Sequence, residues 1–208
     1  PGTKNTIDDL KWLRRTGLES PILNCARKGI PVLGICGGYQ MLGNEIDDSC
    51  GAETGEVVPG LGLLPVKTVF SLEKHRTRVK GRICAQSGIW GSVSGCECTG
   101  YEIHMGESRI CEENAQGFIQ LTNQSDLSTR ADGCVRENVA GTYLHGIFDE
   151  VGFCGRLIET LCRQKGRNSA VSGQMSFWEY KQREYDKLAD VIRENMDMEY
   201  LYRVMGLA

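Results

Sequence analysis

The chain has 208 residues, of which 40% are apolar and 25% are charged, and its formal net charge is −3. This size and composition are typical of one globular α/β domain, alone or with a short extension. The sequence contains no basic tract, no apolar run as long as a membrane span and no opening signal peptide. We therefore expect a cytoplasmic protein with no nucleic-acid or membrane partner.

The ten cysteines do not form a recognisable framework. No C-x-x-C pair occurs, and the chain is too long for a small disulfide scaffold. Cys96 and Cys98, with His104 nearby, could bind a metal, but plain reduced thiols are the preferred interpretation. We expect no metal site, and most of the cysteines to be inert.

The first part of the chain predicts helices around one buried strand. It opens on PGTKNT, a turn with nothing before it to connect, which predicts that a strand precedes Pro1 in the complete protein. Helices are predicted over about 6–17 and 20–28. The apolar run at 30–35 predicts a strand, and a helix should begin near Tyr39.

The remainder predicts a β-rich region followed by helices. Short β-like runs, separated by Gly, Ser and Asn clusters, fill 61–134, and an apolar run at 139–148 ends near a histidine. A helix is predicted over 151–164, and the stretch 175–205 is strongly helical. The segment 165–173 between them has the composition of a flexible linker.

One cysteine lies on a turn that suits a nucleophile. Cys36 sits in GICGG, between the predicted strand and helix, which is the G-x-nucleophile-x-G pattern of a nucleophile elbow. Small neighbours permit the strained turn, the following helix N-terminus favours a thiolate, and the N–H of Gly37 can donate to an oxyanion. A buried structural cysteine is the alternative for this pentapeptide alone.

A cysteine nucleophile needs a base, and three histidines are available. His145 closes the apolar run GTYLHG, which places it near the carboxyl end of a strand, where open α/β sheets bind ligands. His104 lies in GYEIHMG and could line a site, whereas His75 lies in the basic stretch EKHRTR and is expected at the surface. The sequence therefore favours Cys36 with His145.

Several longer stretches, in chain order, carry a family resemblance. They are PGTKNTIDDLKWLRRTGL, GIPVLGICGGYQMLG, GLGLLPVKT, GYEIHMGES, VAGTYLHGIFD and YKQREYDKLADVIRENMDM. In this order they resemble the glutamine amidotransferase domain of the cobyric acid synthase family, over nearly the whole chain. The related cobyrinate a,c-diamide synthases are similar at the elbow, but their loop in place of PGTKNT differs.

The resemblance implies a three-layer, flavodoxin-like α/β fold of the class I (triad-type) glutamine amidotransferases. Its sheet should be mixed and mainly parallel, with the N-terminal strands missing from this chain. The domain is expected over 1–165, with a helical extension over 166–208.

The resemblance also implies the chemistry of the site. Cys36 would attack the side-chain amide of glutamine, and His145 would carry the proton to the departing ammonia. The oxyanion would be held by the N–H of Gly37 and by a second donor, Thr3. The resulting glutamyl thioester would then be hydrolysed by water.

Four further positions match substrate-binding positions of similar enzymes. Gln40, one turn beyond the nucleophile, corresponds to a residue that contacts bound glutamine. Tyr101, Glu102 and His104 match a motif that forms part of the glutamine pocket wall.

One departure from the class concerns the third member of the triad. Class I enzymes commonly carry a glutamate two residues after the histidine, to orient the imidazole. Here that position is Ile147, and the cobyric acid synthase family resembles this chain in lacking the acid. Asp149, Glu102, a backbone carbonyl or a partner domain could serve instead. We treat the site as a dyad and expect neither carboxylate within about 3.2 Å of His145.

The family enzymes have an N-terminal ATP-binding synthetase domain, and no phosphate-loop motif occurs in this sequence. The resemblance implies that ammonia serves ATP-dependent and Mg-dependent amidation of adenosylcobyrinic acid a,c-diamide, a corrinoid of cobalamin biosynthesis, on that domain. This domain itself should need no cofactor. Open alternatives are a different acceptor, such as a cell-wall lipid precursor, a non-catalytic binding module, and a thiol protease.

Overall fold

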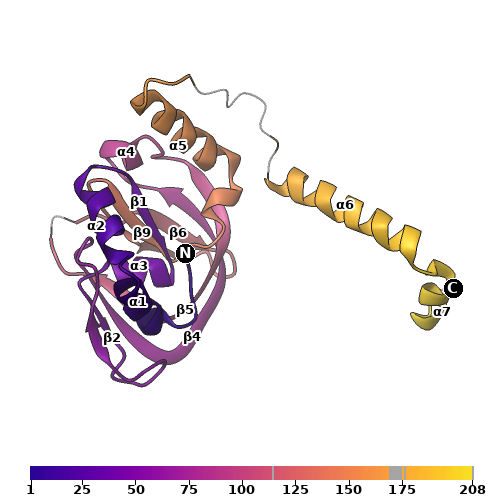
Figure 1. Ribbon diagram of the computed structural model, residues 1–208, viewed down its shortest axis with the longest axis horizontal. Coiled ribbons are helices and arrows are strands. Elements are labelled where there is room, and N and C mark those ends of the chain that lie inside the picture. The colour runs from indigo at the N-terminus through magenta and orange to yellow at the C-terminus, as the bar shows by residue number, and fades with distance from the viewer. Residues whose placement is uncertain (114, 169–174, 176, 208) are drawn as a thin grey trace. The chain divides into compact units, whose positions relative to one another are not determined.

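The computed structural model describes residues 1–113, 115–168, 175 and 177–207 (Figure 1). The chain divides into two compact units, Pro1–Ala170 and Val171–Ala208. The linker predicted over 165–173 spans this division, and its residues 169–173 lie outside the described residues.

A small sheet lies at the centre of the first unit and has the strand order β1-β9-β8. Strand β1 (Val32–Ile35) is parallel to β9 (Val139–Thr142), and β8 (Cys134–Arg136) is antiparallel to β9. The predicted strand at 30–35 is confirmed from Val32 onward. The parallel pairing brings the ends of β1 and β9 to one edge, so the residues that follow both strands meet there.

Three helices come from the start of the chain: α1 (Thr6–Arg15), α2 (Glu19–Arg27) and α3 (Gly37–Leu42). The first two confirm the predicted helices and stop short of glycines with positive φ, Gly17 and Gly29, which is a common way for a helix to end. Helix α3 begins at Gly37, before the predicted Tyr39, because the turn at Cys36 leads directly into it.

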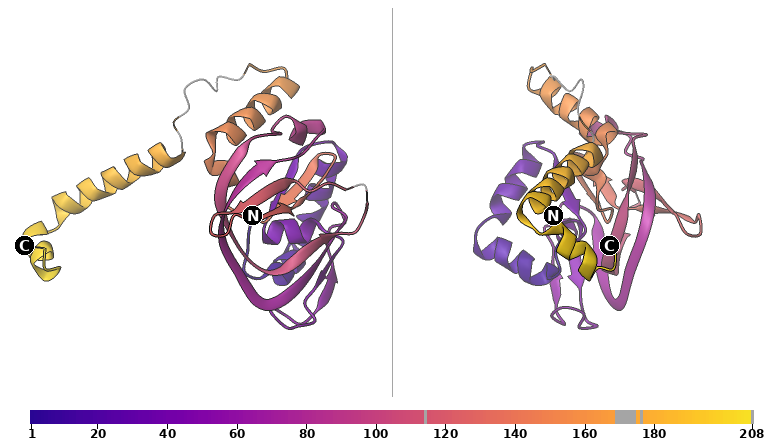
Figure 2. Two further views of the ribbon diagram at one scale, coloured as in Figure 1. Left: turned by 180° about the vertical axis from the view of Figure 1, so that it is seen from behind. Right: turned by 90° about the vertical axis from the view of Figure 1, so that its right-hand side faces the viewer.

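The larger sheet has the order β3-β2-β4-β6-β7, with β5 paired to β4, and its long β4–β5 hairpin curves through the first unit (Figure 2). Its strands are β2 (Glu45–Asp47), β3 (Val57–Pro59), β4 (Val66–Ile83), β5 (Glu97–Ile110), β6 (Ile119–Asn123) and β7 (Thr129–Asp132). A short helix, α4 (Gly88–Gly91), lies between β4 and β5.

The prediction of a mixed sheet is confirmed, but the prediction that it is mainly parallel is wrong. Of the seven strand pairs among the described residues, only β1–β9 and β2–β4 are parallel. Short connections such as the turn between β6 and β7 force antiparallel pairing, whereas parallel pairing requires a long crossover.

The small sheet is covered on both faces. On one side its residues pack with Tyr39 and Leu42 of α3. On the other, Leu33 and Ala140 pack with the inner residues of β4 to β6 and with Phe153 of helix α5 (Val151–Gln164). The bounds of α5 confirm the predicted helix. A short 3-10 helix, η1 (Ile147–Asp149), leads into it.

The second unit contains helices α6 (Phe177–Asn195) and α7 (Met198–Val204), where the sequence predicts one helical stretch. The break falls at Asp197, whose side chain accepts a hydrogen bond from the N–H of Tyr200 at 2.9 Å and caps α7. Among the described helices, none has the length and apolar character needed to cross a bilayer.

Gly141→Ala should destabilise the fold, because a methyl group there would overlap the ring of Tyr39 across the small sheet. Overpacking of this kind costs about 1–3 kcal/mol. Gly152→Ala, in α5, is the matched control, because its methyl would meet nothing within 4 Å. We expect the control to be neutral or slightly stabilising. Urea unfolding of both variants measures the difference, and equal stabilities would contradict this packing.

Candidate active site

Cys36 occupies a strained strand-to-helix turn. Its φ is 53° and its ψ is −114°, a conformation that residues with a side chain rarely adopt. Its N–H donates to the carbonyl of Thr142 at 2.8 Å, so the turn is tied to the end of β9. A Cβ at Gly34 would lie 2.7 Å from the carbonyl atoms of Gly38, which explains the glycines of the GICGG pattern. The predicted elbow geometry is therefore present.

His145 lies beside Cys36, with Gly2 between them. A methyl group at Gly2 would lie 2.8 Å from Cε1 of His145 and 3.4 Å from Cβ of Cys36. The Nδ1 of the imidazole would be 3.7 Å from the same methyl. The Cε1–Nδ1 edge of the ring therefore faces the space next to the nucleophile, and only a glycine fits there.

Both side chains line one cavity of about 560 Å³. This active-site pocket also contains most of the site residues predicted from the sequence. Its lining is Gly2, Thr3, Lys4, Thr6, Cys36, Gln40, Glu53, Phe70, Lys74, Tyr101, Ile103, His104, Met105 and His145. Residues from the N-terminal loop, the elbow, strand β5 and the end of β9 thus converge. Gly37 and Glu102 are not part of the lining.

The two predicted oxyanion donors lie next to each other. A Cβ on Gly37 would be 3.2 Å from the backbone nitrogen of Thr3. The N–H of Gly37 is also close enough to the Cys36 thiol to stabilise the thiolate. The hydroxyl of Thr3 donates to Asp9 and accepts from the N–H of Asn5, which holds the N-terminal loop over the turn.

Gln40 is fixed at both ends of its amide. Its Oε1 accepts from the hydroxyl of Thr6 at 3.2 Å, and its Nε2 donates to the hydroxyl of Tyr143 at 3.1 Å. That hydroxyl is in turn 2.6 Å from Oγ of Ser108 on β5. The side chain of Gln40 is buried, so its orientation toward the pocket is set by this network.

Tyr101 and His104 form part of the pocket wall. The ring of Tyr101 stacks on that of His145, with centroids 5.0 Å apart and planes 3° apart, and the two residues form an antiparallel backbone bridge. The ring of His104 stacks on Tyr143 at 3.9 Å, and its Nδ1 is 2.8 Å from the carbonyl oxygen of Gly106. Burial lowers the pKa of His104, which favours its neutral form.

The structure brings no carboxylate into contact with the imidazole of His145 within the described residues. Ile147 is fully buried in the core, so its position offers no room for an acid. Asp149 ends η1, and Glu150 stands between it and the start of α5. Glu102 is 1% exposed and lies behind the pocket, paired with Arg130.

Burial favours the neutral forms of the Cys36 thiol and the His145 imidazole. It raises the pKa of Cys36, although the N–H of Gly37 opposes this, and it lowers the pKa of His145, although the carboxylate of Glu102 opposes that shift. Both shifts favour a mechanism in which the thiolate forms by proton transfer during the reaction.

Glu53 is a pocket residue that sequence reasoning missed. Its carboxylate accepts from the N–H of Ile7, at the start of α1, at 3.1 Å. The loop that carries it is held by buried Asp48, whose oxygens accept four backbone N–H groups between Ala52 and Gly55. The loop composition DDSCGAETG indicates a turn, but nothing local to it shows that the turn reaches the site.

Asp132 is a second missed residue, and it supports the segment that leads to His145. Its carboxylate accepts from the hydroxyl of Thr142 and from the N–H of Tyr143, the latter at 3.1 Å. Burial raises its pKa to about 6, against hydrogen bonds that lower it. The folded protein thus binds this proton more tightly than the unfolded chain, whose aspartate titrates near 3.8.

Asp132→Asn should flatten the pH dependence of stability between about pH 4 and pH 6. Because the pKa of Asp132 is higher in the folded protein than in the unfolded chain, protonated Asp132 stabilises the fold. This stabilisation is fully present below pH 3.8 and is lost as the pH rises through about 6. An asparagine does not titrate, so this loss disappears. Urea unfolding at several pH values measures it, with exposed Asp126→Asn as control. Parallel curves for wild type and Asp132→Asn would contradict the assignment.

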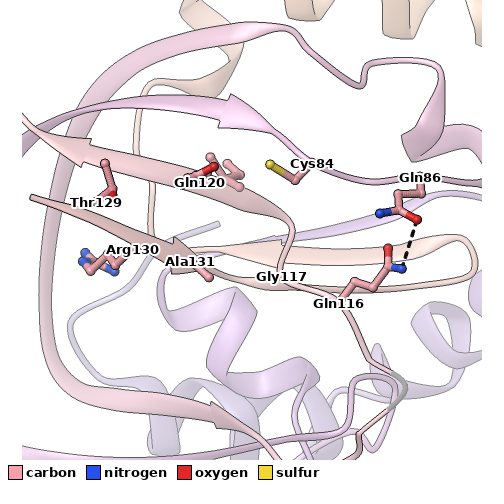
Figure 3. A pocket seen from close by; sticks show the side chains of 9 residues that line it. Cys84, Gln86, Gln116, Gly117, Gln120, Thr129, Arg130 and Ala131 are labelled. Atoms are coloured by element: carbon pink, nitrogen blue, oxygen red, sulfur yellow. Dashed lines mark hydrogen bonds between the residues drawn. The ribbon is translucent and has the colours of Figure 1, made fainter.

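Two other places in the fold were candidates for a functional site, but within the part of the chain that the structure describes neither brings together the groups that catalysis or metal binding requires. A pocket of about 480 Å³ lies over β6 and β7, where Gln86 and Gln116 are joined by a hydrogen bond, and its lining has no histidine or carboxylate (Figure 3). Cys96, just before β5, donates to the carbonyl of Gly152 in α5, whereas His104 lies within β5 and lines the active-site pocket. No group of three potential metal ligands was found among the described residues.

These features are those of a glutamine amidotransferase, and comparison with known proteins gives the family. A family model, the CobB/CobQ-like glutamine amidotransferase domain, matches residues 1–153. The chain therefore belongs to this family, which confirms the resemblance found in the sequence.

Two relatives named cobyric acid synthase are each 44% identical to the chain and cover 99% of it. They come from Lachnoclostridium phytofermentans and Ruminiclostridium cellulolyticum, and the chain covers 41% and 40% of their lengths. The chain thus spans about two fifths of the relatives it matches. A solved structure described as a glutamine amidotransferase has a TM-score of 0.47 at 16% identity, covering 77% of this chain and 76% of its own.

Proposed function

We propose that this domain hydrolyses the side-chain amide of glutamine and releases ammonia. The observation that carries the proposal is the position of Cys36. It lies on a strained turn and lines the same pocket as His145, with only Gly2 between the two side chains. Family membership supports it, because the matched family is defined as a glutamine amidotransferase domain.

In the proposed mechanism Cys36 loses its proton to His145 and attacks the amide carbon of glutamine. The carbonyl oxygen becomes an oxyanion, which accepts hydrogen bonds from the N–H of Gly37 and from Thr3. His145 returns the proton to the nitrogen, the C–N bond breaks and ammonia leaves. Water, deprotonated by His145, then attacks the thioester carbon and the C–S bond breaks. Glutamate is released, and His145 returns the proton to the sulfur, which regenerates the thiol.

The pocket offers complementary groups for the rest of the substrate. Gln40, held between Thr6 and Tyr143, can bond the substrate amide or backbone groups. The carboxylate of Glu53 suits the α-ammonium group, and the ammonium of Lys4 or Lys74 suits the α-carboxylate. Tyr101 and His104 enclose the aliphatic part of the substrate.

We further propose that the ammonia amidates a carboxylate of adenosylcobyrinic acid a,c-diamide in cobalamin biosynthesis. The similarity to relatives named cobyric acid synthase supports this acceptor over a cell-wall lipid. Activation of that carboxylate by ATP and Mg would take place on a separate synthetase domain. The relatives named cobyric acid synthase have room for such a domain, because this chain covers only about two fifths of their length.

Cys36→Ala should abolish release of glutamate from glutamine, by at least about 10³-fold, because the thioester cannot form. In the complete protein, amidation driven by added ammonia should persist, since the thiol serves only to release ammonia. Exposed Cys84→Ala is the control and should retain both activities. Equal loss of both activities in Cys36→Ala would show a structural role.

His145→Asn should slow thioester formation on the order of 10²-fold or more, as expected for loss of a positioned base. His75→Asn is the control, because His75 is exposed on β4 and outside the pocket lining. Rapid-quench measurement of the first turnover separates this step from hydrolysis. A larger effect of His75→Asn would overturn the assignment of the base.

A further inference from the structure

Two buried polar atoms behind the active-site pocket have no hydrogen-bond partner among the described residues. One is Nε2 of His145, and the other is Oε1 of Glu102. A buried polar atom without a partner costs about 1–3 kcal/mol, so two such atoms in one site call for an explanation.

The two residues are neighbours in the fold through the backbone of Tyr101, without a direct contact between the two atoms. Glu102 follows Tyr101, whose backbone exchanges two hydrogen bonds with that of His145, at 2.9 and 3.2 Å. The Cε1–Nδ1 edge of the imidazole faces Gly2 and the nucleophile, so Nε2 is the nitrogen left for an orienting partner. The carboxylate of Glu102 also acts electrostatically on the imidazole, since it raises the pKa of His145 against the effect of burial.

Two other side chains lie near the carboxylate of Glu102, but neither donates a hydrogen bond to Oε1. Arg130 contacts Oε2, the other carboxylate oxygen. His104 lies 3.9 Å from Oε1, but its Nδ1 is used on the carbonyl of Gly106. A neutral His104 that donates through Nδ1 carries no proton on Nε2, so it cannot donate to Glu102. This leaves Oε1 as an acceptor with no donor.

We infer that Glu102 is the positioning residue of His145: its Oε1 accepts from Nε2–H through one bridging water, and so it serves in place of the acid that class I enzymes carry at the position of Ile147. This inference rests on the proposed function and deepens it. With its proton on Nε2, the imidazole presents the lone pair of Nδ1 to the Cys36 thiol. When Nδ1 takes the thiol proton, the carboxylate stabilises the imidazolium in a site of low dielectric.

This role differs from the substrate contact predicted for Glu102 from the sequence. A side chain that is 1% exposed and outside the pocket lining acts on the reaction through another residue. The two roles therefore differ in their kinetic signatures. Loss of a substrate contact raises KM, whereas loss of an orienting acid lowers kcat and changes the titration of the base.

The test uses Glu102→Gln in the whole chain, with glutamine as substrate. We expect kcat for glutamate release to fall about 10²-fold with little change in KM. The acid limb of the kcat/KM profile should move to lower pH by roughly one pH unit, because the carboxylate that raises the pKa of His145 is gone. Glu102→Asp should recover part of kcat. Glu107→Gln, exposed on the same strand, is the control and should change neither parameter.

NMR of the imidazoles provides a readout that needs no turnover. With three histidines in the chain, His145→Asn identifies the signals of His145. The wild-type ring should be the Nε2–H tautomer, and its pKa should fall in Glu102→Gln. The Nδ1–H tautomer in wild type, an unchanged pKa, or a rise in KM alone would each overturn the inference. If the wild type released no glutamate, the proposed function would fail while the tautomer would still decide the role of Glu102.

Discussion

The active site depends on how closely the backbone can approach the turn at Cys36. The loop of residues 1–4 lies directly on this turn, with the carbonyl of Pro1 accepting from the N–H of Gly38 at 3.0 Å. A side chain on Gly37 would collide with Thr3, and one on Gly2 would collide with His145. The nucleophile, the oxyanion donors and the base therefore come together only because these positions lack a Cβ.

The same constraint operates on the far side of the site. A Cβ on Gly100 would overlap the carbonyl oxygen of His145, so strand β5 can pair with the segment after β9 only through a glycine. This pairing sets the position of His145, stacks Tyr101 on it and brings Ile103 to the thiol, whose Sγ is 3.4 Å from the Ile103 carbonyl. The β4–β5 hairpin is thus part of the catalytic geometry.

The features that the sequence predicts well are those with a local signal. GICGG specifies the turn at Cys36 within five residues, and the period of apolar residues specifies helices such as α1 and α5. Glu53 and Asp132 could not be found in this way, because their roles depend on which distant backbone groups their carboxylates meet. The sheet was predicted as mainly parallel because the resemblance concerns the class as a whole, whereas pairing in this chain follows its short turns.

The burial of Ile147 and the burial of Glu102 have a common physical basis. Ile147 follows the histidine into η1 and fills the core beneath α5 with Phe153 and Leu157. A carboxylate at that position would be desolvated among apolar side chains. Glu102 is equally buried but has the guanidinium of Arg130 beside it. A buried carboxylate is therefore tolerated at Glu102 on β5 but not at the position of Ile147 after β9. On our inference, strand β5 both forms part of the pocket wall and supplies the carboxylate that orients His145.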